Sequence, residues 1–389
     1  MKRLKKDFLR VMNEAVARGE TPGVVSLVWR DGEEILCAKS GHADLGKGTP
    51  MERDTILRLY SLSKPMTAVL AMTLVEAGKL DILAPVSEFL PTYQNQRVAV
   101  DDAQSVPVAR PMLVKDLFSM TSGLCYPGED TPAERAAAKL FDAIDAEATQ
   151  GNQPDTQAIA SRIGELPLAF SPGDGWRYGT STDVLGAVLE VVSGKPLDVL
   201  FSETLFAPLG MNDTGFWVPP EKTERFATLY ERKDGILSPY PENNFGLTYY
   251  FSRPNYLSGG GGLTATADDV LRFARMLLGE GTLGNERIIS PQSVKWLSGN
   301  HLTKRQMETI YFDSMYGYGY GGFMRVLLSP SKSFGLGVAG EFGWDGWAGS
   351  YMTVCPDRNM VFVTMQHRTD LGTGPLTRKL RNILYAHID

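Results

Sequence analysis

Residues 57–70 read Leu57-Arg58-Leu59-Tyr60-Ser61-Leu62-Ser63-Lys64-Pro65-Met66-Thr67-Ala68-Val69-Leu70, and the rest of the chain can be placed around this stretch. The run from Pro65 to Ala77 predicts a helix, and side chains three positions apart share one face of a helix. Ser61 and Lys64 would then lie together at the helix N-terminus. A serine hydroxyl is a weak nucleophile until a base takes its proton, and lysine is such a base when burial or nearby positive charge lowers its pKa. The stretch therefore predicts a nucleophile and its base within one turn.

A Ser-x-x-Lys pattern is short and often arises by chance. The chain contains a second copy, Ser329-Pro330-Ser331-Lys332, in a Pro/Ser-rich stretch between strand-like segments. No helical run follows that copy, so its context predicts a loop. An apolar run precedes Ser61 and a helical run follows it, which favours the first copy as the reactive one.

Composition indicates an ordinary globular protein. The chain has 389 residues, enough for two domains or one large one, with 43% hydrophobic and 22% charged residues. A formal net charge of −6 argues against a nucleic-acid partner. No apolar run is long enough to span a membrane, and the basic N-terminus is not followed by a signal-peptide core. We therefore expect a cytoplasmic protein without a membrane or nucleic-acid partner.

Cysteine and histidine spacing argues against disulfides and metals. The three cysteines, Cys37, Cys125 and Cys355, are odd in number and far apart, which predicts buried thiols. The four histidines show no metal-ligand spacing. The glycine run at residues 258–263 lacks the Gly-Lys-Ser/Thr ending of a phosphate loop and predicts close backbone approach before a helix capped by Thr266. No metal and no cofactor are expected.

Strand-like segments occur at both ends of the chain, and helical segments occupy the part between them. Strands are expected at residues 23–29, 34–40, 318–327, 335–339, 349–354 and 359–366. The principal helices are expected at residues 4–18, 65–77, 133–149, 155–165, 181–193, 197–205, 267–278, 290–297 and 372–387. This pattern predicts an α+β fold, with an antiparallel sheet made from both ends of the chain and flanked by helices. Residues 1–80 and 225–389 would form the sheet domain, residues 81–224 an inserted mainly helical domain, and the active site would lie between them.

Two further segments could carry chemistry. Residues 170–181 contain a Pro-Gly turn, an expected short strand ending at Tyr178, and a helix that begins within three residues. A tyrosine placed there could move protons for a Ser–Lys pair if adjacent positive charge favours the phenolate; the alternative is a packing role. Residues 341–350 form a Gly/Trp turn whose backbone N–H groups could approach a carbonyl, as an oxyanion hole requires; the alternative is a plain β-hairpin. The chain contains no Gly-x-Ser-x-Gly nucleophile elbow.

Several landmarks follow one another along the chain: Ser61-Leu62-Ser63-Lys64, residues 117–124, Tyr178-Gly179-Thr180, residues 208–211, and the glycine run ending at Gly262-Leu263. Taken together, they resemble the serine β-lactamase-like and penicillin-binding-protein superfamily. The chain is most similar to its class C branch, which includes the family VIII carboxylesterases. The resemblance extends from about residue 23 to the C-terminus and implies a β-lactamase-like fold.

The departures from this pattern bear on the substrate. Class C β-lactamases carry a Lys-Thr-Gly motif, which binds the substrate carboxylate, and this chain has Trp344-Asp345-Gly346 in its place. That sequence resembles the Trp-Gly-Gly of many of the esterases, from which Asp345 also departs. Thr180 replaces the usual asparagine. The resemblance therefore implies hydrolysis of esters rather than of β-lactams.

The resemblance also implies roles for individual residues. Ser61 would attack a short-chain ester to form an acyl-serine, while Lys64 and Tyr178 share the proton transfers. Backbone N–H groups of Ser61 and Trp347 would hold the oxyanion. A short apolar acyl pocket would have three aromatic walls: Tyr126, Trp344 and Trp347.

Three alternatives to a carboxylesterase remain at this stage. The first is a β-lactamase or D-amino-acid peptidase, and the second is an acyltransferase or amide hydrolase of the same fold. The third is a catalytically silent binding or scaffold protein. The expected partner of the first two, as of the esterase, is a small molecule.

Overall fold

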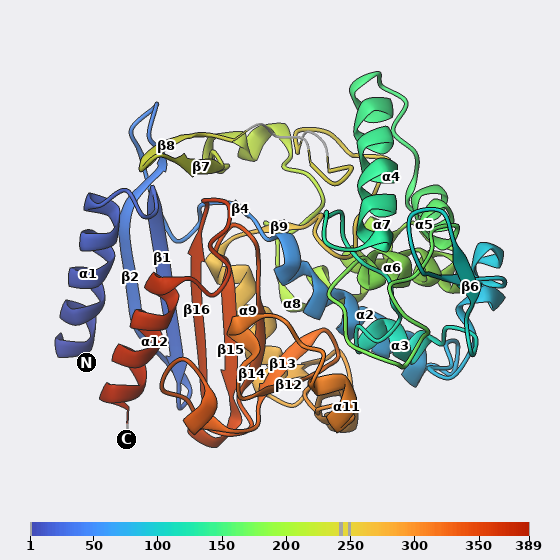
Figure 1. Cartoon of the computed structure of the whole chain (residues 1–389). Helices are drawn as coiled ribbons and strands as arrows, with labels where there is room; N and C mark the ends of the chain where they lie inside the picture. Colours follow the sequence, from blue (N-terminus) through green and yellow to red (C-terminus); the bar gives the residue numbers. More distant parts are fainter. Residues whose placement is uncertain (1, 241–243, 248–249, 389) are drawn as a thin grey trace.

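An eight-stranded antiparallel sheet, built from both ends of the chain, is the largest element of the structure (Figure 1). The computed structural model describes residues 2–240, 244–247 and 250–388. The strands lie in the order β12 (Tyr318–Gly321), β13 (Met324–Leu327), β14 (Phe342–Asp345), β15 (Tyr351–Cys355), β16 (Met360–Gln366), β1 (Gly23–Arg30), β2 (Glu33–Asp44) and β3 (Thr49–Pro50). The predicted α+β fold, with a sheet from both ends of the chain, is confirmed.

The pairing of β1 with β16 joins the two ends of the chain. Val24 lies opposite Gln366 and Arg30 opposite Met360. Residues 23–28 of β1 and all residues of β16 are buried, because helices cover both faces of this part of the sheet. Strands buried on both faces have continuous apolar sequences rather than alternating ones. The sequences Gly-Val-Val-Ser-Leu-Val and Met-Val-Phe-Val-Thr-Met follow this rule.

Helices α1 (Lys2–Ala17) and α12 (Pro375–His387) pack side by side on one face, and α9 (Ala267–Leu278) covers the other (Figure 1). Apolar residues of α1 recur at helical spacing and are buried: Leu4, Phe8, Val11, Met12 and Ala15. They meet Leu376, Leu380 and Leu384 of α12 in one apolar cluster. Burial of one such large side chain contributes about 1.5–3 kcal/mol, which makes this layer a major source of stability.

The remaining helices lie mostly beside the sheet (Figure 1). They are α2 (Ser63–Glu76), α3 (Val114–Phe118), α4 (Pro132–Thr149), α5 (Thr156–Gly164), α6 (Ser181–Ser193), α7 (Leu197–Phe201), α8 (Ala207–Leu209), α10 (Pro291–Leu297) and α11 (Lys304–Met307). The buried helices α2 and α6 pack against each other. Within the described ranges, no helix combines the length and apolarity needed to cross a membrane. The division into a sheet domain and an inserted helical domain stays a prediction.

The structure corrects four local expectations. The segment 318–327, expected as one strand, is a hairpin of β12 and β13. The segment 335–339, expected as a strand, is a loop before β14, because Gly335 and Gly337 within it and the serines before it favour turns. The segment before Tyr178, also expected as a strand, has no regular structure. A short hairpin interrupts the mainly helical region, where little strand character was expected. That hairpin and the other short strand pairs are β5 (Arg97–Ala99) with β6 (Ser105–Pro107), β4 (Leu57–Arg58) with β9 (Thr264–Ala265), β7 (Tyr230–Lys233) with β8 (Ile236–Pro239), and β10 (Thr282–Leu283) with β11 (Glu286–Arg287).

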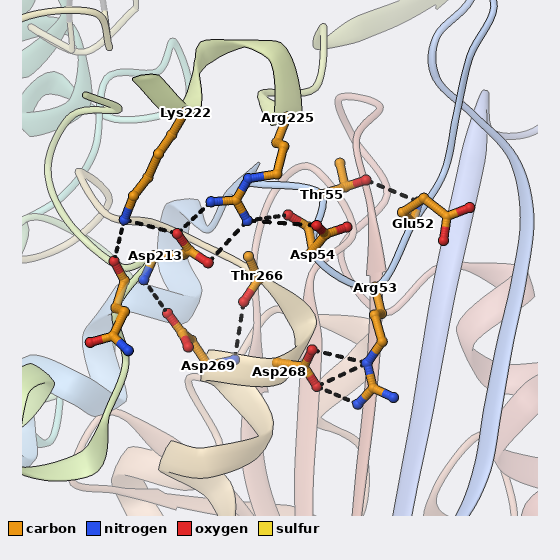
Figure 2. Close-up of polar contacts among 11 residues, drawn as sticks. Glu52, Arg53, Asp54, Thr55, Asp213, Lys222, Arg225, Thr266, Asp268 and Asp269 are labelled. Atoms are coloured by element: carbon orange, nitrogen blue, oxygen red, sulfur yellow. Dashed lines mark hydrogen bonds and ion pairs between the residues drawn. The ribbon is translucent and has the colours of Figure 1, made fainter. Parts of the chain in front are cut away.

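An ion-pair network holds the chain that leads into β4 (Figure 2). Arg225 donates to both carboxylate oxygens of Asp213, at 3.0 and 2.6 Å, and Lys222 lies 2.9 Å from the same group. Arg53, a few residues before β4, binds Asp268 in the first turn of α9. Thr266 caps α9 by accepting from Asp269 N–H, as its sequence predicts. These contacts attach residues 52–55 to the start of α9 and so set the position of β4, from which the chain runs directly to Ser61.

A buried ion pair attaches α12 to the start of β14. Arg381 and Glu341 form a hydrogen-bonded pair, and their side chains are 5% and 1% exposed. Tyr385 donates to Glu341, and Arg381 donates to the hydroxyl of Tyr351. Removing one partner of such a pair leaves an uncompensated buried charge, which costs far more than the loss of a surface contact.

We expect Arg381→Leu to lower the free energy of unfolding by about 3–5 kcal/mol, because Glu341 would remain buried without its cation. Urea denaturation followed by circular dichroism measures this loss. The matched control is Arg10→Leu, which breaks an exposed pair with Glu14 on α1 and should cost at most about 1 kcal/mol. Equal losses in the two variants would contradict a stabilising role for the buried pair.

Candidate active site

Ser61 lies in a strained turn at the start of α2. It occupies the centre of a 3-10 turn, Tyr60–Leu62, which runs directly into the helix. Tyr60 has a φ of 46°, in the left-handed region that bulky residues rarely occupy. Backbone strain of this kind persists only where the surrounding structure holds it, and it gathers at functional sites. Here it places the Ser61 side chain on the wall of a cavity.

Lys64 is fully buried and faces three oxygen atoms. Its Nζ lies 3.0 Å from Ser61 Oγ, 2.9 Å from the hydroxyl of Tyr126 and 2.7 Å from the carbonyl oxygen of Gly260. Burial lowers the pKa of Lys64 to about 7, against the charges of Asp183 and Asp345, which raise it. A large fraction of Lys64 is therefore neutral near pH 7, where an exposed lysine would be charged.

The three partners of Lys64 suit a neutral amine. A neutral amine has two N–H groups and one lone pair, whereas an ammonium group has three donors and no acceptor. The Gly260 carbonyl can only accept, so it takes one N–H. The hydroxyls of Ser61 and Tyr126 can each donate or accept, so one of them takes the second N–H and the other donates to the lone pair. When Ser61 donates, the arrangement is that of a hydroxyl and its general base.

Tyr178 lies on the other side of Ser61. Its hydroxyl hydrogen-bonds to the Ser61 side chain and accepts from the indole N–H of Trp344, at 3.1 Å. Burial raises the pKa of Tyr178 well above its usual value, although both hydrogen bonds oppose this. A phenolate at Tyr178 was expected only if adjacent positive charge favoured it, and desolvation by burial is the larger influence on this hydroxyl. A tyrosine in this environment could take part in proton transfer as a relay, by giving one proton while it takes another.

Gly179 brings Tyr178 and Tyr126 together. A Cβ at Gly179 would lie 2.3 Å from the carbonyl oxygen of Leu124, so only glycine lets the two chain segments pass this closely. The rings of Tyr126 and Tyr178 are consequently 5.7 Å apart, and Lys64 Nζ lies 5.3 and 4.9 Å from their centroids. Steric constraints therefore explain the glycine in the motif Tyr178-Gly179-Thr180.

The turn between β14 and β15 packs against the Ser61 turn. A Cβ at Gly346 would lie 2.1 Å from the carbonyl oxygen of Leu59, which Ser350 Oγ reaches at 2.9 Å. The rings of Tyr60 and Trp347 meet edge to face at 5.2 Å. Residues 341–350 do form a hairpin, and its tip lies beside Ser61. The turn that carries Trp347 therefore packs against the turn that carries Ser61, as an oxyanion hole made by their backbone N–H groups would need.

A cavity of about 390 Å³ opens over Ser61. Its walls are mainly aromatic: Tyr60, Tyr126, Phe141, Tyr178, Tyr256 and Trp347. Tyr126 and Trp347 lie where an acyl pocket was expected to have walls. Trp344 does not line the cavity; it is 2% exposed and lies behind Tyr178 as a hydrogen-bond donor. Larger hollows, of about 680, 560 and 520 Å³, lie away from Ser61.

Asp183 is a site residue that the sequence did not reveal. It is 4% exposed in the first turn of α6, five positions after Tyr178. Its Oδ1 accepts from Tyr256 at 2.9 Å, from Gly260 N–H at 3.1 Å, and from Ser258. These bonds fix the glycine run, whose Gly260 carbonyl holds Lys64. The only signal in the sequence is a charged residue in the first turn of a mainly apolar helix.

Other candidate residues lie outside this constellation. Ser329 precedes a 3-10 turn, Pro330–Lys332, between β13 and β14, so the second Ser-x-x-Lys lies in a connection without a following helix, as expected. The cysteines are free thiols; Cys125 and Cys355 are buried and Cys37 is partly exposed. Across residues 2–240, 244–247 and 250–388, no three His, Cys, Asp or Glu side chains gather in a way that could hold a metal ion.

A family model, related sequences and a solved structure are similar to this chain over nearly its whole length. The family model described as Beta-lactamase matches residues 8–386. Protein Rv1367c of Mycobacterium tuberculosis (strain ATCC 25618 / H37Rv) is 33% identical over 379 residues, covering 93% of this chain and 90% of that protein. Esterase EstB of Burkholderia gladioli is 31% identical over 394 residues, covering 97% and 94%. The solved structure of EstCE1, titled a hydrolase with promiscuous acyltransferase activity, is 26% identical, has a TM-score of 0.84 and covers 99% of both chains.

We expect Tyr178→Phe and Lys64→Arg each to lower kcat by about 10²- to 10⁴-fold, the usual contribution of a general acid–base group. Tyr178→Phe removes only a hydroxyl, and Lys64→Arg keeps a charge that arginine does not lose near neutral pH. Ester-hydrolysis kinetics measure both effects, with circular dichroism as the check on folding. The double variant should be little slower than the slower single variant, because the two groups act as one unit. A folded Tyr178→Phe variant with most of its kcat intact would rule out the relay.

We expect Asp183→Asn to move the acid limb of the kcat/KM profile to lower pH. Lys64 must be neutral to act as a base, so activity rises as pH passes through the pKa of Lys64, about 7. The charge of Asp183 raises that pKa, and its removal must lower it; Asp345, Tyr126 and Tyr178, which also face Lys64, are unchanged. A pH–rate profile tests this, with Asp357→Asn on the β15–β16 turn as control. A slower enzyme with an unmoved acid limb would mean that Asp183 acts only through packing.

Proposed function

Because this chain belongs to the Beta-lactamase family and is a serine hydrolase of that fold with esterase relatives, we propose that it hydrolyses short-chain carboxylic esters through an acyl-serine intermediate. The observation that carries the proposal is Lys64, fully buried and 3.0 Å from Ser61 Oγ at the base of an aromatic cavity. A neutral lysine in contact with a serine is a nucleophile with its base, and a scaffold or binding protein has no need of it.

Acylation follows from the positions of these groups. Ser61 Oγ attacks the ester carbonyl carbon and its proton passes to Lys64 Nζ. The negative charge that develops on the carbonyl oxygen is stabilised by the backbone N–H groups of Ser61 and Trp347. As the tetrahedral intermediate collapses, the bond to the alcohol oxygen breaks. Tyr178 gives its proton to that oxygen and takes the one held by Lys64, so that the phenol never carries a lasting charge.

Deacylation uses the same groups in the same order. Lys64, neutral again, takes a proton from a water molecule, and the resulting hydroxide attacks the acyl carbon. The Ser61–acyl bond breaks, and the proton returns through Lys64 and Tyr178 to Ser61 Oγ. The acid leaves from a pocket of about 390 Å³, a volume at the lower end for small-molecule sites, which suits a short acyl chain.

The site is poorly suited to penicillins. Where β-lactamases of the similar class C branch carry Lys-Thr-Gly for the substrate carboxylate, this chain carries Trp344-Asp345-Gly346, so an indole takes the place of the lysine. The carboxylate of Asp345 accepts from Arg325 at 3.3 Å and from Thr373, and Arg325 is itself buried. Arg325 is thereby engaged behind the site and is not offered to a substrate. The site therefore lacks the cation of Lys-Thr-Gly and has a carboxylate next to that position, which opposes binding of an anion.

Transfer of the acyl group to an alcohol is a second candidate activity. EstCE1, which superimposes over 99% of both chains, is titled as having promiscuous acyltransferase activity. An acyl-serine reacts with any nucleophile that reaches it, and an apolar aromatic pocket lowers the local share of water. Product analysis in the presence of added short alcohols separates transfer from hydrolysis.

We expect p-nitrophenyl acetate and butyrate to be hydrolysed with a kcat/KM far above that for nitrocefin or a penicillin. Ser61→Ala should abolish both ester turnover and covalent labelling by a fluorophosphonate probe, because it removes the attacking oxygen. Ser329→Ala, the matched control in the second Ser-x-x-Lys, should leave both unchanged. Labelling that persists in Ser61→Ala and disappears in Ser329→Ala would reverse the assignment, and a penicillin kcat/KM equal to that of the esters would overturn the substrate class.

A further inference from the structure

Asp370 places a carboxylate at the wall of the cavity over Ser61. It follows β16 and is exposed, yet it lines the cavity together with Trp347 and Ser61. The described lining residues include one other charged side chain, Asp183, which is buried and accepts from three donors. No lysine or arginine is among the described residues that line this cavity. A substrate that enters it therefore meets one solvent-facing charge, and that charge is negative.

Asp370 is held in place and is not a freely moving surface side chain. Its Oδ1 accepts from the indole N–H of Trp347 at 2.7 Å. The turn that carries it is bound to the β14–β15 turn by backbone bonds from Leu371 N–H to Trp347 and from Arg368 N–H to Ala348, at 3.0 and 3.2 Å. Its φ of 59° lies in the left-handed region, which aspartate and asparagine tolerate better than other side chains. The carboxylate thus has a fixed position relative to Trp347 and Ser61.

The nearby cations do not line the cavity. Burial lowers the pKa of Arg368 and the charge of Asp370 opposes this, but Arg368 is not among the lining residues. Arg325 is buried against Asp345 and Thr373. Lys64 is fully buried and does not line the cavity either. Of the charged side chains that do line it, Asp370 is therefore the one that faces solvent.

The aromatic rings beside Asp370 favour the same kind of ligand. The rings of Tyr60 and Trp347 line the cavity and meet edge to face at 5.2 Å. Tyr240, outside the lining, meets Trp347 edge to face at 5.4 Å, and Asp370 binds the indole N–H of Trp347. Ring faces attract a cation by about 0.5–1 kcal/mol at exposed sites and about 2 kcal/mol when it is desolvated. A carboxylate beside such rings is the arrangement that recognises an organic ammonium group.

We propose that Asp370 selects substrates by charge, so that esters with an ammonium group on the alcohol side are favoured over uncharged esters, and esters with a carboxylate there are disfavoured. This inference rests on the proposed esterase function. A short acyl group fills the pocket beside Ser61, and the alcohol portion then extends toward the opening, where Asp370 and the ring of Trp347 lie. The charge acts on binding of the substrate and takes no part in the chemical steps.

The test compares three acetate esters of similar size. Acetylcholine carries an ammonium group, 3,3-dimethylbutyl acetate is its uncharged counterpart, and 4-acetoxybutanoate carries a carboxylate; release of acetic acid is followed by pH-stat titration. Asp370→Asn is the informative variant, because asparagine keeps the left-handed backbone and can still accept from Trp347 while losing the charge. Asp357→Asn, an exposed aspartate on the β15–β16 turn, is the matched control.

In the unaltered enzyme we expect kcat/KM to fall from acetylcholine to the uncharged ester to the carboxylate ester, by about threefold to tenfold at each step, as expected for a partly screened charge contact. Asp370→Asn should bring the ratios among the three kcat/KM values close to one, and added salt should have a similar effect. Tetramethylammonium should inhibit hydrolysis of the uncharged ester, and less so after Asp370→Asn.

Two results would overturn the inference and separate it from the proposed function. Charge selection is refuted if the enzyme hydrolyses all three esters without a charge preference. It is also refuted if Asp357→Asn alters the preference as much as Asp370→Asn does. Either result leaves the proposed esterase function intact. Failure of the unaltered enzyme to hydrolyse any of the three esters or p-nitrophenyl acetate, together with absence of fluorophosphonate labelling, refutes both.

Discussion

The rest of the site depends on one buried hydrogen bond, which Lys64 Nζ donates to the carbonyl oxygen of Gly260 at 2.7 Å. Desolvation brings the pKa of the amine down to about 7. The carbonyl takes one N–H and so leaves the amine only one donor and one lone pair for the two hydroxyls beside it. An exposed lysine at the same distance from Ser61 would be charged and useless as a base. Asp183 fixes the glycine run through hydrogen bonds to Gly260 N–H and Ser258, and so positions the Gly260 carbonyl that Lys64 contacts.

The sheet contributes the second half of the site through two close backbone approaches. Gly346 fits under Leu59 only because it lacks a side chain, and this contact sets the tip of the β14–β15 hairpin beside the strained Tyr60. The ion pair of Arg381 with Glu341 holds the start of the same hairpin from the opposite face of the sheet. Helix α12 thereby fixes one side of the proposed oxyanion hole, although none of the described bonds joins it to Ser61.

The sequence predicted the positions of site residues whose partners are close to them in the chain. It did not predict those of residues whose partners are distant in the chain. Ser61 and Lys64 share one turn, and helical spacing alone places them together. A charge in the first turn of a helix is the only local signal for Asp183, because its partners lie more than seventy positions further along the chain. Trp344 was expected at the pocket wall, and the structure places it behind Tyr178. The sequence shows that a ring is present, but it does not show toward which face of the strand the ring points. The sheet was predictable because β1 and β16 are continuous apolar runs. The loop at 335–339 was not, since short alternating stretches resemble strands.

The pairing of β1 with β16 has a consequence for synthesis on the ribosome. The hairpin of β1 and β2 emerges early, but its inner edge has no partner until residues 360–366 have been translated. For nearly the whole of elongation the nascent chain therefore carries an apolar strand with an open edge, the kind of surface that pairs with other chains. Closure of so long a loop makes the last step of folding slow compared with that of a protein built from local contacts. Ser61 and Lys64 are in place in the chain long before Trp347 is added, so a polypeptide released early would hold a serine and its base without the turn that completes the site.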